Sequence, residues 1–369
     1  MIIARTWQDN EAGQEGLEHM KRFACSMMLV LLLIGVVSIA ANAIEYKIID
    51  LGILTSGDSC AHDVNNTGQV VGYYNLVPGI EYPFLWDSNG MQEFLAQPGS
   101  GIVSRKCIAC SINESGTIVG YSLPLSDGVH AFAWSNTGGL KDLGYGFACG
   151  INTQGVIVGE SNGDACYWDT SGIKHNMAPV NYFSSASDIN DAGQAVGSFC
   201  NSACFWQDVN HMQIIGSLNN ATYSNACGIN QSGTVVGYSC NYDYKVSSDA
   251  KVFIWDEVNL MQEIVIPEAS AAYAFDINNQ GLIVGSTLDS DGKHQAYVWD
   301  SVNGAQYLNT LNGGEAEARA INNNGWIVGV SSGHAVIWMP VPEPSSLIAL
   351  VGGLAGVAGM LRRRLSVSR

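Results

Sequence analysis

The chain has 369 residues, of which 47% are apolar and 13% are charged, and its formal net charge is −17. This acidity argues against nucleic-acid binding, which requires a basic surface. The low charged fraction, together with 42 glycines, favours strands and turns over helices.

The N-terminal segment has the three parts of a secretory signal. A Lys-Arg pair precedes an apolar run at 27–39, and Ala41 and Ala43 then supply the small residues that a signal peptidase recognises. The run is too short for a membrane anchor. We therefore expect residues 1–43 to be a signal peptide cleaved after Ala43. A start at Met20, directly before the basic pair, fits this order better than a start at Met1.

One motif, A-x-x-[IV]-N-x-x-G-x-x-V-G, occurs seven times in the body of the chain. The copies, called repeats 1 to 7 in chain order, are Ala61–Gly72, Ala109–Gly120, Ala148–Gly159, Ala186–Gly197, Ala226–Gly237, Ala274–Gly285 and Ala318–Gly329. Each copy is followed by one tryptophan, namely Trp86, Trp134, Trp168, Trp206, Trp255, Trp299 and Trp338. The motif asparagines lie 38 to 48 residues apart, and the variation falls after the motif, as surface loops allow.

Each repeat predicts a small antiparallel unit. The Asn-x-x-Gly step predicts a tight turn, because Asn can bond its own backbone and Gly can take positive φ. The following β-branched run predicts a buried strand, and its closing Gly predicts close approach of a neighbouring backbone. The strand that ends in Trp comes next. Candidate fourth strands are Met91–Leu95, Leu140–Leu143, Met212–Ile215, Met261–Ile266 and Gln306–Leu308.

Three to four strands per repeat of this length predict an all-β fold, a β-propeller of seven blades with about four strands each, over residues 44–340. A β-solenoid and a linear array are the alternatives. Closure of a ring is favoured because repeat 7 stops at Trp338 without a fourth strand. The segment Tyr46–Gly52 resembles the fourth-strand segment Lys141–Gly144, and we expect it to pair into the last blade.

The whole unit resembles the bacterial extracellular HAF repeat, whose name comes from the triplet seen here as His130-Ala131-Phe132. The resemblance covers residues 46–338, although the other copies depart from the triplet itself. It implies secretion and a propeller-like fold, and it implies no enzymatic activity.

The C-terminal segment, residues 341–369, has a second three-part signal. Its residues are Pro342, Glu343 and Pro344, then an apolar run at 347–361, then Arg362, Arg363 and Arg364. The run predicts a transmembrane helix whose basic end stays in the cytoplasm. This order resembles the PEP-CTERM sorting signal. The resemblance implies processing by an exosortase-like enzyme near the Pro-Glu-Pro motif, in a Gram-negative bacterium that makes exopolysaccharide or biofilm matrix.

The predicted export determines which oxidation state we expect for the cysteines. Disulfides form in oxidising compartments, and the candidates are Cys149 with Cys166, within one repeat, and Cys200 with Cys204, around one short turn. No spacing indicates a metal site, and the sequence indicates no cofactor.

Three acids share one position, two residues before the motif Asn: Asp63, Asp188 and Asp276. If that strand lines a central channel, the three carboxylates could face one space and hold a cation or a polar ligand. The alternative is capping of turns and solvation of strand ends.

No nucleophile, metalloprotease or phosphate-loop motif is present, so the sequence names no catalytic residue. We expect an exported, non-enzymatic binding or structural module of the cell envelope or extracellular matrix. It would reach the inner membrane as an anchored precursor and then the cell surface or medium. Expected partners are signal peptidase, an exosortase-like enzyme, and a polysaccharide or a surface protein. The alternatives are a propeller hydrolase or lyase acting on exopolysaccharide, and an inert coat protein.

Overall fold

A computed structural model describes residues 44–342, apart from 53–56, 78, 94–103, 125–127 and 242–248. In these residues the chain forms 28 strands and two 3-10 turns, η1 (Leu218–Asn220) and η2 (Leu311–Gly313), and no α-helix. The all-β prediction is therefore confirmed. Within this part of the chain no helix is long and apolar enough to cross a membrane. The predicted signal peptide and C-terminal helix lie outside it.

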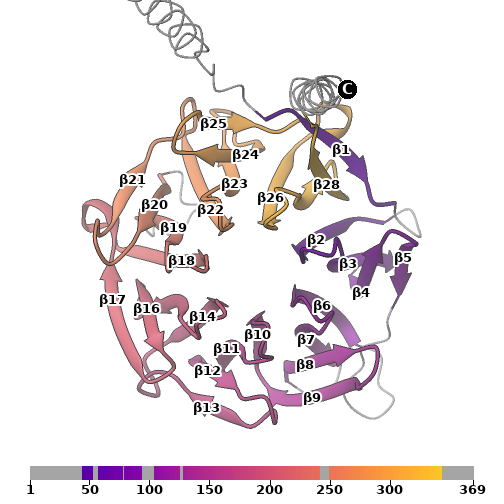
Figure 1. Cartoon of the computed structure of the whole chain (residues 1–369), viewed down its shortest axis with the longest axis vertical. Coiled ribbons are helices and arrows are strands. Elements are labelled where there is room, and N and C mark those ends of the chain that lie inside the picture. The colour runs from indigo at the N-terminus through magenta and orange to yellow at the C-terminus, as the bar shows by residue number, and fades with distance from the viewer. Residues whose placement is uncertain are drawn as a thin grey trace, which may run out of the picture. The chain divides into compact units, whose positions relative to one another are not determined.

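The strands form antiparallel four-stranded sheets that radiate from a common axis, which is the architecture of a β-propeller (Figure 1). The innermost strands are β2 (Ser59–Val64), β6 (Ser104–Ile112), β10 (Phe147–Ile151), β14 (Ser184–Ile189), β18 (Tyr223–Ile229), β22 (Ala271–Ile277) and β26 (Ala316–Ile321). The second strands are β3 (Val70–Val77), β7 (Ile118–Pro124), β11 (Ile157–Ser161), β15 (Ala195–Phe199), β19 (Val235–Cys240), β23 (Ile283–Leu288) and β27 (Ile327–Ser331).

The third strands carry the repeat tryptophans at or near their ends. They are β4 (Ile80–Asp87), β8 (His130–Ser135), β12 (Asp164–Trp168), β16 (Ser202–Asp208), β20 (Lys251–Trp255), β24 (His294–Asp300) and β28 (His334–Pro340). The outer strands are β5 (Gly90–Glu93), β9 (Gly139–Tyr145), β13 (Lys174–Asn176), β17 (His211–Gly216), β21 (Gln262–Ile264), β25 (Gly304–Tyr307) and β1 (Tyr46–Asp50). All five predicted fourth strands are confirmed, and β13 is an additional one.

Two of the four-stranded units are joined into one eight-stranded sheet. The strands β2 to β5 and β6 to β9 meet through β4 and β6, which share a single parallel pair, Glu81 with Lys106. The same two side chains form an ion pair at 3.1 Å. The remaining sheets have four strands each.

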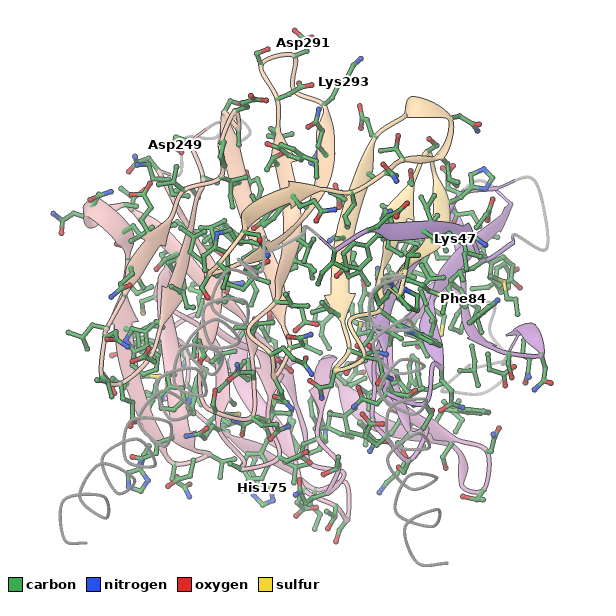
Figure 2. All side chains as sticks on the ribbon, turned by 45° about the horizontal axis from the view of Figure 1, so that its top comes forward. Lys47, Phe84, His175, Asp249, Asp291 and Lys293 are labelled. Atoms are coloured by element: carbon green, nitrogen blue, oxygen red, sulfur yellow. The ribbon has the colours of Figure 1, made fainter. Side chains whose placement is uncertain are left out.

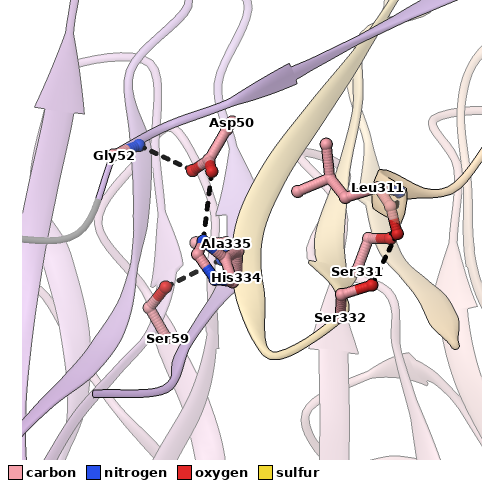
Figure 3. Close-up of polar contacts among 8 residues, drawn as sticks. All are labelled: Asp50, Gly52, Ser59, Leu311, Ser331, Ser332, His334 and Ala335. Atoms are coloured by element: carbon pink, nitrogen blue, oxygen red, sulfur yellow. Dashed lines mark hydrogen bonds and ion pairs between the residues drawn. The ribbon is translucent and has the colours of Figure 1, made fainter. Parts of the chain in front are cut away.

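The ring closes through β1, as the sequence predicts. Strand β1 pairs antiparallel with β28, in the order β1-β28-β27-β26, so the start of the described chain completes the sheet of repeat 7. The Asp50 carboxylate accepts a hydrogen bond from the Gly52 N–H at 2.9 Å and pairs with His334 Nδ1 at 3.1 Å (Figure 3). Asp142 makes the same contacts with Gly144 and His130 in repeat 2. The terminal strand therefore reproduces a regular outer strand in detail.

The repeat glycines behave as predicted at both positions. In repeat 5, Gly233 of the turn has φ +81° and donates to the Asn230 carbonyl at 3.1 Å. Gly237, which lies inside β19 and not at its end, is against the neighbouring backbone, because a Cβ there would be 2.0 Å from the Asn225 carbonyl oxygen. The same close approach recurs in every repeat, which explains why each second strand contains V-G.

The hydrophobic core lies between neighbouring sheets. One cluster combines Val236 and Ile264 of repeat 5 with Ile277, Ile283 and Tyr297 of repeat 6. Tryptophans add polar contacts across the same boundaries: the Nε1–H groups of Trp168, Trp206 and Trp338 each donate to a carbonyl of the preceding repeat, at 2.7 to 3.0 Å. Each sheet is thus buried only when both neighbours are present.

Candidate functional site

The axis of the ring is built on the motif asparagines, which follow the innermost strands. Each Asn donates through Nδ2 to the backbone carbonyl of the motif Asn in the next repeat, at 3.0 to 3.3 Å. The series runs from Asn65 through all repeats to Asn322, and Asn322 donates back to Asn65. All seven side chains are buried, with 2 to 6% of their surface exposed. The asparagines therefore form a closed ring of hydrogen bonds, which we call the Asn ring.

The same amides also hold their own turns. Asn230 Oδ1 accepts the backbone N–H groups of Ser232 and Thr234 at 3.1 and 3.0 Å, while its Nδ2 reaches Asn278 in the next repeat. One side chain thus fixes a local turn and joins two sheets. Aspartate could not replace it, because a carboxylate has no donor for the second contact.

The residue after each motif Asn is polar in every repeat, and these residues surround the axis. They are Asn66, Glu114, Thr153, Asp191, Gln231, Asn279 and Asn323, which we call the collar. Six backbone N–H groups of the collar donate to the side chain of the next collar residue, at 2.8 to 3.3 Å. The collar lines a pocket of about 200 Å³, with Ile112, Ile151 and Ile189 among its other lining residues.

The three acids of the inner strands bridge neighbouring repeats. Asp188 accepts the N–H of Ile189 through Oδ1 at 2.8 Å and the N–H of Ile229, in the next repeat, through Oδ2 at 3.0 Å. Asp276 does the same with Ile277 and Ile321, at 2.7 and 2.8 Å.

Asp63 follows this scheme and makes one extra contact. It binds the N–H groups of Val64 and Ile112 at 2.7 and 2.8 Å, and it also accepts the Ser111 hydroxyl at 2.8 Å. Each of the three carboxylates therefore links two neighbouring repeats by hydrogen bonds, and we call this arrangement a bracket.

Space for two of these brackets comes from glycine in the preceding repeat. A Cβ on Gly150 would lie 3.1 Å from Asp188 Cα, and a Cβ on Gly228 would lie 2.9 Å from Asp276 Cα. In every inner strand the register shifts just before this position, as in a β-bulge. At these two places a glycine therefore leaves the room that the aspartate of the next repeat needs.

Burial raises the pKa of all three carboxyls. The pKa of Asp188 rises from 3.8 to about 6, although its N–H donors and their positive dipoles oppose the shift. The pKa values of Asp63 and Asp276 rise for the same reason, and the Asp188 and Asp63 charges add to the shift of Asp276. The charge on one of these carboxylates therefore affects the pKa of another across the axis.

The cation hypothesis for Asp63, Asp188 and Asp276 has no support in this geometry. Their oxygens are occupied by backbone N–H groups, and the described residues contain no group of three His, Cys, Asp or Glu side chains arranged to hold a metal ion. The alternative from the sequence, capping of backbone groups at strand ends, describes what the carboxylates do.

The projecting turn between β23 and β24 likewise uses its carboxylate, Asp289, for hydrogen bonds within the turn. Figure 2 shows Asp291 and Lys293 at its tip. The Asp289 carboxylate accepts the N–H groups of both residues, at 2.8 and 2.9 Å, and these contacts lower its pKa.

The disulfide predictions are wrong in this structure, where all four candidate cysteines are free thiols. Cys149 lies on β10 and Cys166 on β12, with β11 between them, so their backbones are about 10 Å apart. A disulfide needs Cα atoms within about 7 Å. Cys200 is exposed on the β15–β16 turn, whereas Cys204 is packed in the core, so these two thiols point to different environments.

Of the predicted processing residues, only Pro342 lies in the described part of the chain, two residues after the end of β28. The others, Ala41, Ala43, Glu343, Pro344, Arg362, Arg363 and Arg364, lie outside it. Sequence reasoning missed the Asn ring and the collar. The signal for the collar was present, because the position after the motif Asn is polar in all seven repeats.

Solved structures with a similar fold include propellers of different activities. A streptogramin B lyase is 14% identical with a TM-score of 0.57, over 80% of this chain and 98% of that chain. A catalytically inactive virginiamycin B lyase from Staphylococcus aureus with quinupristin is 13% identical with a TM-score of 0.58, over 81% and 100%. The β-propeller domain of the trilobed protease from Pyrococcus furiosus is 12% identical with a TM-score of 0.50, over 78% and 94%. At these identities the likeness shows the fold alone.

A family model described as a protein of unknown function (DUF3466) matches residues 133–312. No curated protein matches the chain.

Proposed function

We propose that this chain is an exported envelope or matrix protein whose seven-bladed propeller acts as a non-enzymatic binding and structural module. The seven-membered Asn ring and the pairing of β1 with β28 support the count of blades. In this proposal signal peptidase cleaves after Ala43. The segment 341–369 holds the precursor in the inner membrane, and an exosortase-like enzyme then processes it near Pro342.

The use of the inner-strand acids carries the non-enzymatic part of the proposal. A glycoside hydrolase needs two carboxyl groups that flank a bound substrate. Here Asp63, Asp188 and Asp276 are engaged in brackets between sheets, so the axis serves ring stability. The collar pocket offers amide, hydroxyl and carboxylate groups, which suit a polar ligand such as a polysaccharide or a segment of a surface protein.

A second candidate, a hydrolase or lyase acting on exopolysaccharide, has two observations in its favour. Glu114 and Asp191 both line the collar pocket, and two of the similar solved structures are lyases by name. Because those lyases are at most 14% identical to this chain, the likeness supports the fold and does not support a shared activity.

The test begins with the exported full chain, purified from a periplasm, whose N-terminal residue should be Ile44. It is screened on a glycan array with and without calcium, and then incubated with each bound polysaccharide. We expect binding that does not depend on calcium, with no shortening of the polysaccharide chains on size-exclusion chromatography.

Chain shortening that disappears in Glu114→Gln or Asp191→Asn would establish the enzymatic candidate instead. A blank array with well-folded protein would exclude polysaccharide as the ligand. A calcium requirement would contradict the role of the inner-strand carboxylates as brackets between sheets.

A further inference from the structure

Exposed apolar side chains gather in the connection between β13 and β14. Val180, Tyr182 and Phe183 expose 47%, 54% and 83% of their surface. Single exposed apolar residues are ordinary, whereas a cluster on one short segment indicates a contact surface. This segment lies at the start of β14, and the Asn ring lies beyond its end, so the two features are at opposite ends of the strand.

A polar pocket of about 170 Å³ lies beside these rings. Its lining includes Phe183, the Glu160 carboxylate, the Asn201 amide and the hydroxyls of Ser185 and Ser198. The two hydroxyls are 3.2 Å apart, so they share one hydrogen bond and retain further bonding capacity. Burial raises the pKa of Glu160, against the effect of a hydrogen bond from the Gly163 N–H.

The backbone holds Phe183 in place beside this pocket. Phe183 has φ +47°, a left-handed conformation that is strained for a non-glycine residue. Its carbonyl accepts the Cys200 N–H at 3.1 Å, and the Ser184 N–H donates to Gly163 at 2.9 Å. A Cβ on Gly163 would lie 3.6 Å from Phe183 Cδ1, so the ring sits close to that glycine.

The aromatic ring of Tyr182 extends the surface formed by Phe183. Tyr182 stacks on Phe199 with centroids 5.8 Å apart and an interplanar angle of 27°. The other non-glycine residues with positive φ in these loops are Asn162, Asn181, Cys200 and Asn201. Three turns are therefore held in a strained arrangement that presents rings next to a carboxylate and an amide.

These groups match the two sides of a sugar ring. The C–H face of a pyranose packs on an aromatic face, and its hydroxyls bond to carboxylates, amides and hydroxyls. A uronate or sulfate would be repelled by the Glu160 carboxylate that lines the pocket, in a chain of net charge −17. Lys174 is not among the residues that line the pocket, and its Nζ already donates to the Ser161 hydroxyl at 2.6 Å. The chemistry of this pocket therefore favours a neutral sugar.

We propose that this pocket binds one sugar unit of a neutral polysaccharide, with Phe183 stacking on the ring and Glu160 accepting hydroxyl groups. The proposal rests on the binding function proposed above, and it adds to the collar pocket a second pocket with a named ligand class.

The test uses the full exported chain in affinity electrophoresis against dextran, laminarin and galactomannan, with alginate as the acidic counterpart. We expect one neutral polysaccharide to be bound, and we expect Phe183→Ala to weaken that binding about tenfold and Glu160→Gln about fivefold. Val258→Ala is the control, because Val258 is 88% exposed on a turn elsewhere. It should leave the affinity unchanged, and all variants should melt like the wild type.

The failures can be told apart. If the wild type binds a neutral polysaccharide and both site variants behave like Val258→Ala, this pocket is not the site, while the binding function stands. Binding of alginate alone overturns the neutral-sugar class. If the wild type binds none of the four, both the pocket and the polysaccharide-binding function fall.

Discussion

The side-chain amide of Asn230 both holds a local turn and links two neighbouring repeats. Asn230 accepts two backbone N–H groups of its own turn and donates to the carbonyl of Asn278, 48 residues later. The first role follows from the Asn-x-x-Gly pattern. The second depends on where the next repeat lies in space, which no local pattern contains, and so the sequence predicted the turn and not the ring.

Removing that amide should cost more than an ordinary surface change. We expect Asn230→Ala to lower the free energy of unfolding by about 3 kcal/mol, because a buried carbonyl and two N–H groups lose their partner. Urea unfolding followed by tryptophan fluorescence measures the effect. Asn259→Ala, on an exposed turn where the side-chain amide donates to Asp256 at 2.8 Å, should change stability by less than about 0.5 kcal/mol. Equal losses in both variants would refute the ring's contribution.

The cysteine predictions failed at the same scale for a related reason. Cys149 and Cys166 are 17 residues apart in sequence, yet an intervening strand separates them. Closeness along the chain is a poor guide within a sheet, since alternate strands of one repeat do not touch.

At the scale of the strand, glycine decides how closely inner and second strands approach. We expect Gly237→Ala to destabilise the protein by more than about 3 kcal/mol, because the new Cβ would lie 2.0 Å from the Asn225 carbonyl oxygen and 2.7 Å from Phe253 Cζ. The measurement is the urea midpoint, with soluble yield as a second readout.

Gly155→Ala is the matched control for this substitution. Gly155 has φ +85° and open space around it, so alanine there adds only backbone strain of about 1 to 2 kcal/mol. If the two variants were equally stable, close approach would not be what selects glycine in the second strands.

Strand prediction worked where apolar residues marked the strand. The one missed outer strand, β13, consists of Lys174, His175 and Asn176, all exposed, so it carries no hydrophobic signal. Strand β1 was found despite its distance in sequence, because Asp50-Leu51-Gly52 repeats the local pattern of Asp142-Leu143-Gly144. The similarity between repeats thus identified β1 as an outer strand, although the other strands of its sheet lie far away in the sequence.

At the scale of the whole ring, the three brackets link stability to pH. The folded pKa of Asp188, about 6, exceeds its ordinary value of 3.8, so the folded protein binds more protons between these values. The stability from this group is complete below pH 3.8 and is lost as the pH rises through 6. We expect the urea midpoint of the wild type to rise, relative to that of Asp188→Asn, when the pH falls from about 7 to about 5.

The comparison with the variant is needed because other groups titrate nearby. Burial and the Arg319 charge lower the pKa of His62 to about 4, which has the opposite effect on stability over the same range. That contribution is common to both proteins and cancels in the difference. A difference that stays constant across this pH range would show that Asp188 keeps an ordinary pKa in the folded state.

The closing hydrogen bond of the Asn ring joins Asn322 to Asn65, residues that are 257 positions apart. A ribosome adding about 5 to 20 residues per second needs roughly 13 to 50 s to cover that interval. For all of that time the first repeat lacks one of its two neighbours, so the apolar face that packs on repeat 7 stays uncovered. Assembly of this molecule is therefore timed by its last repeat, and any helper protein that shields the nascent chain must stay bound to its beginning until its end arrives.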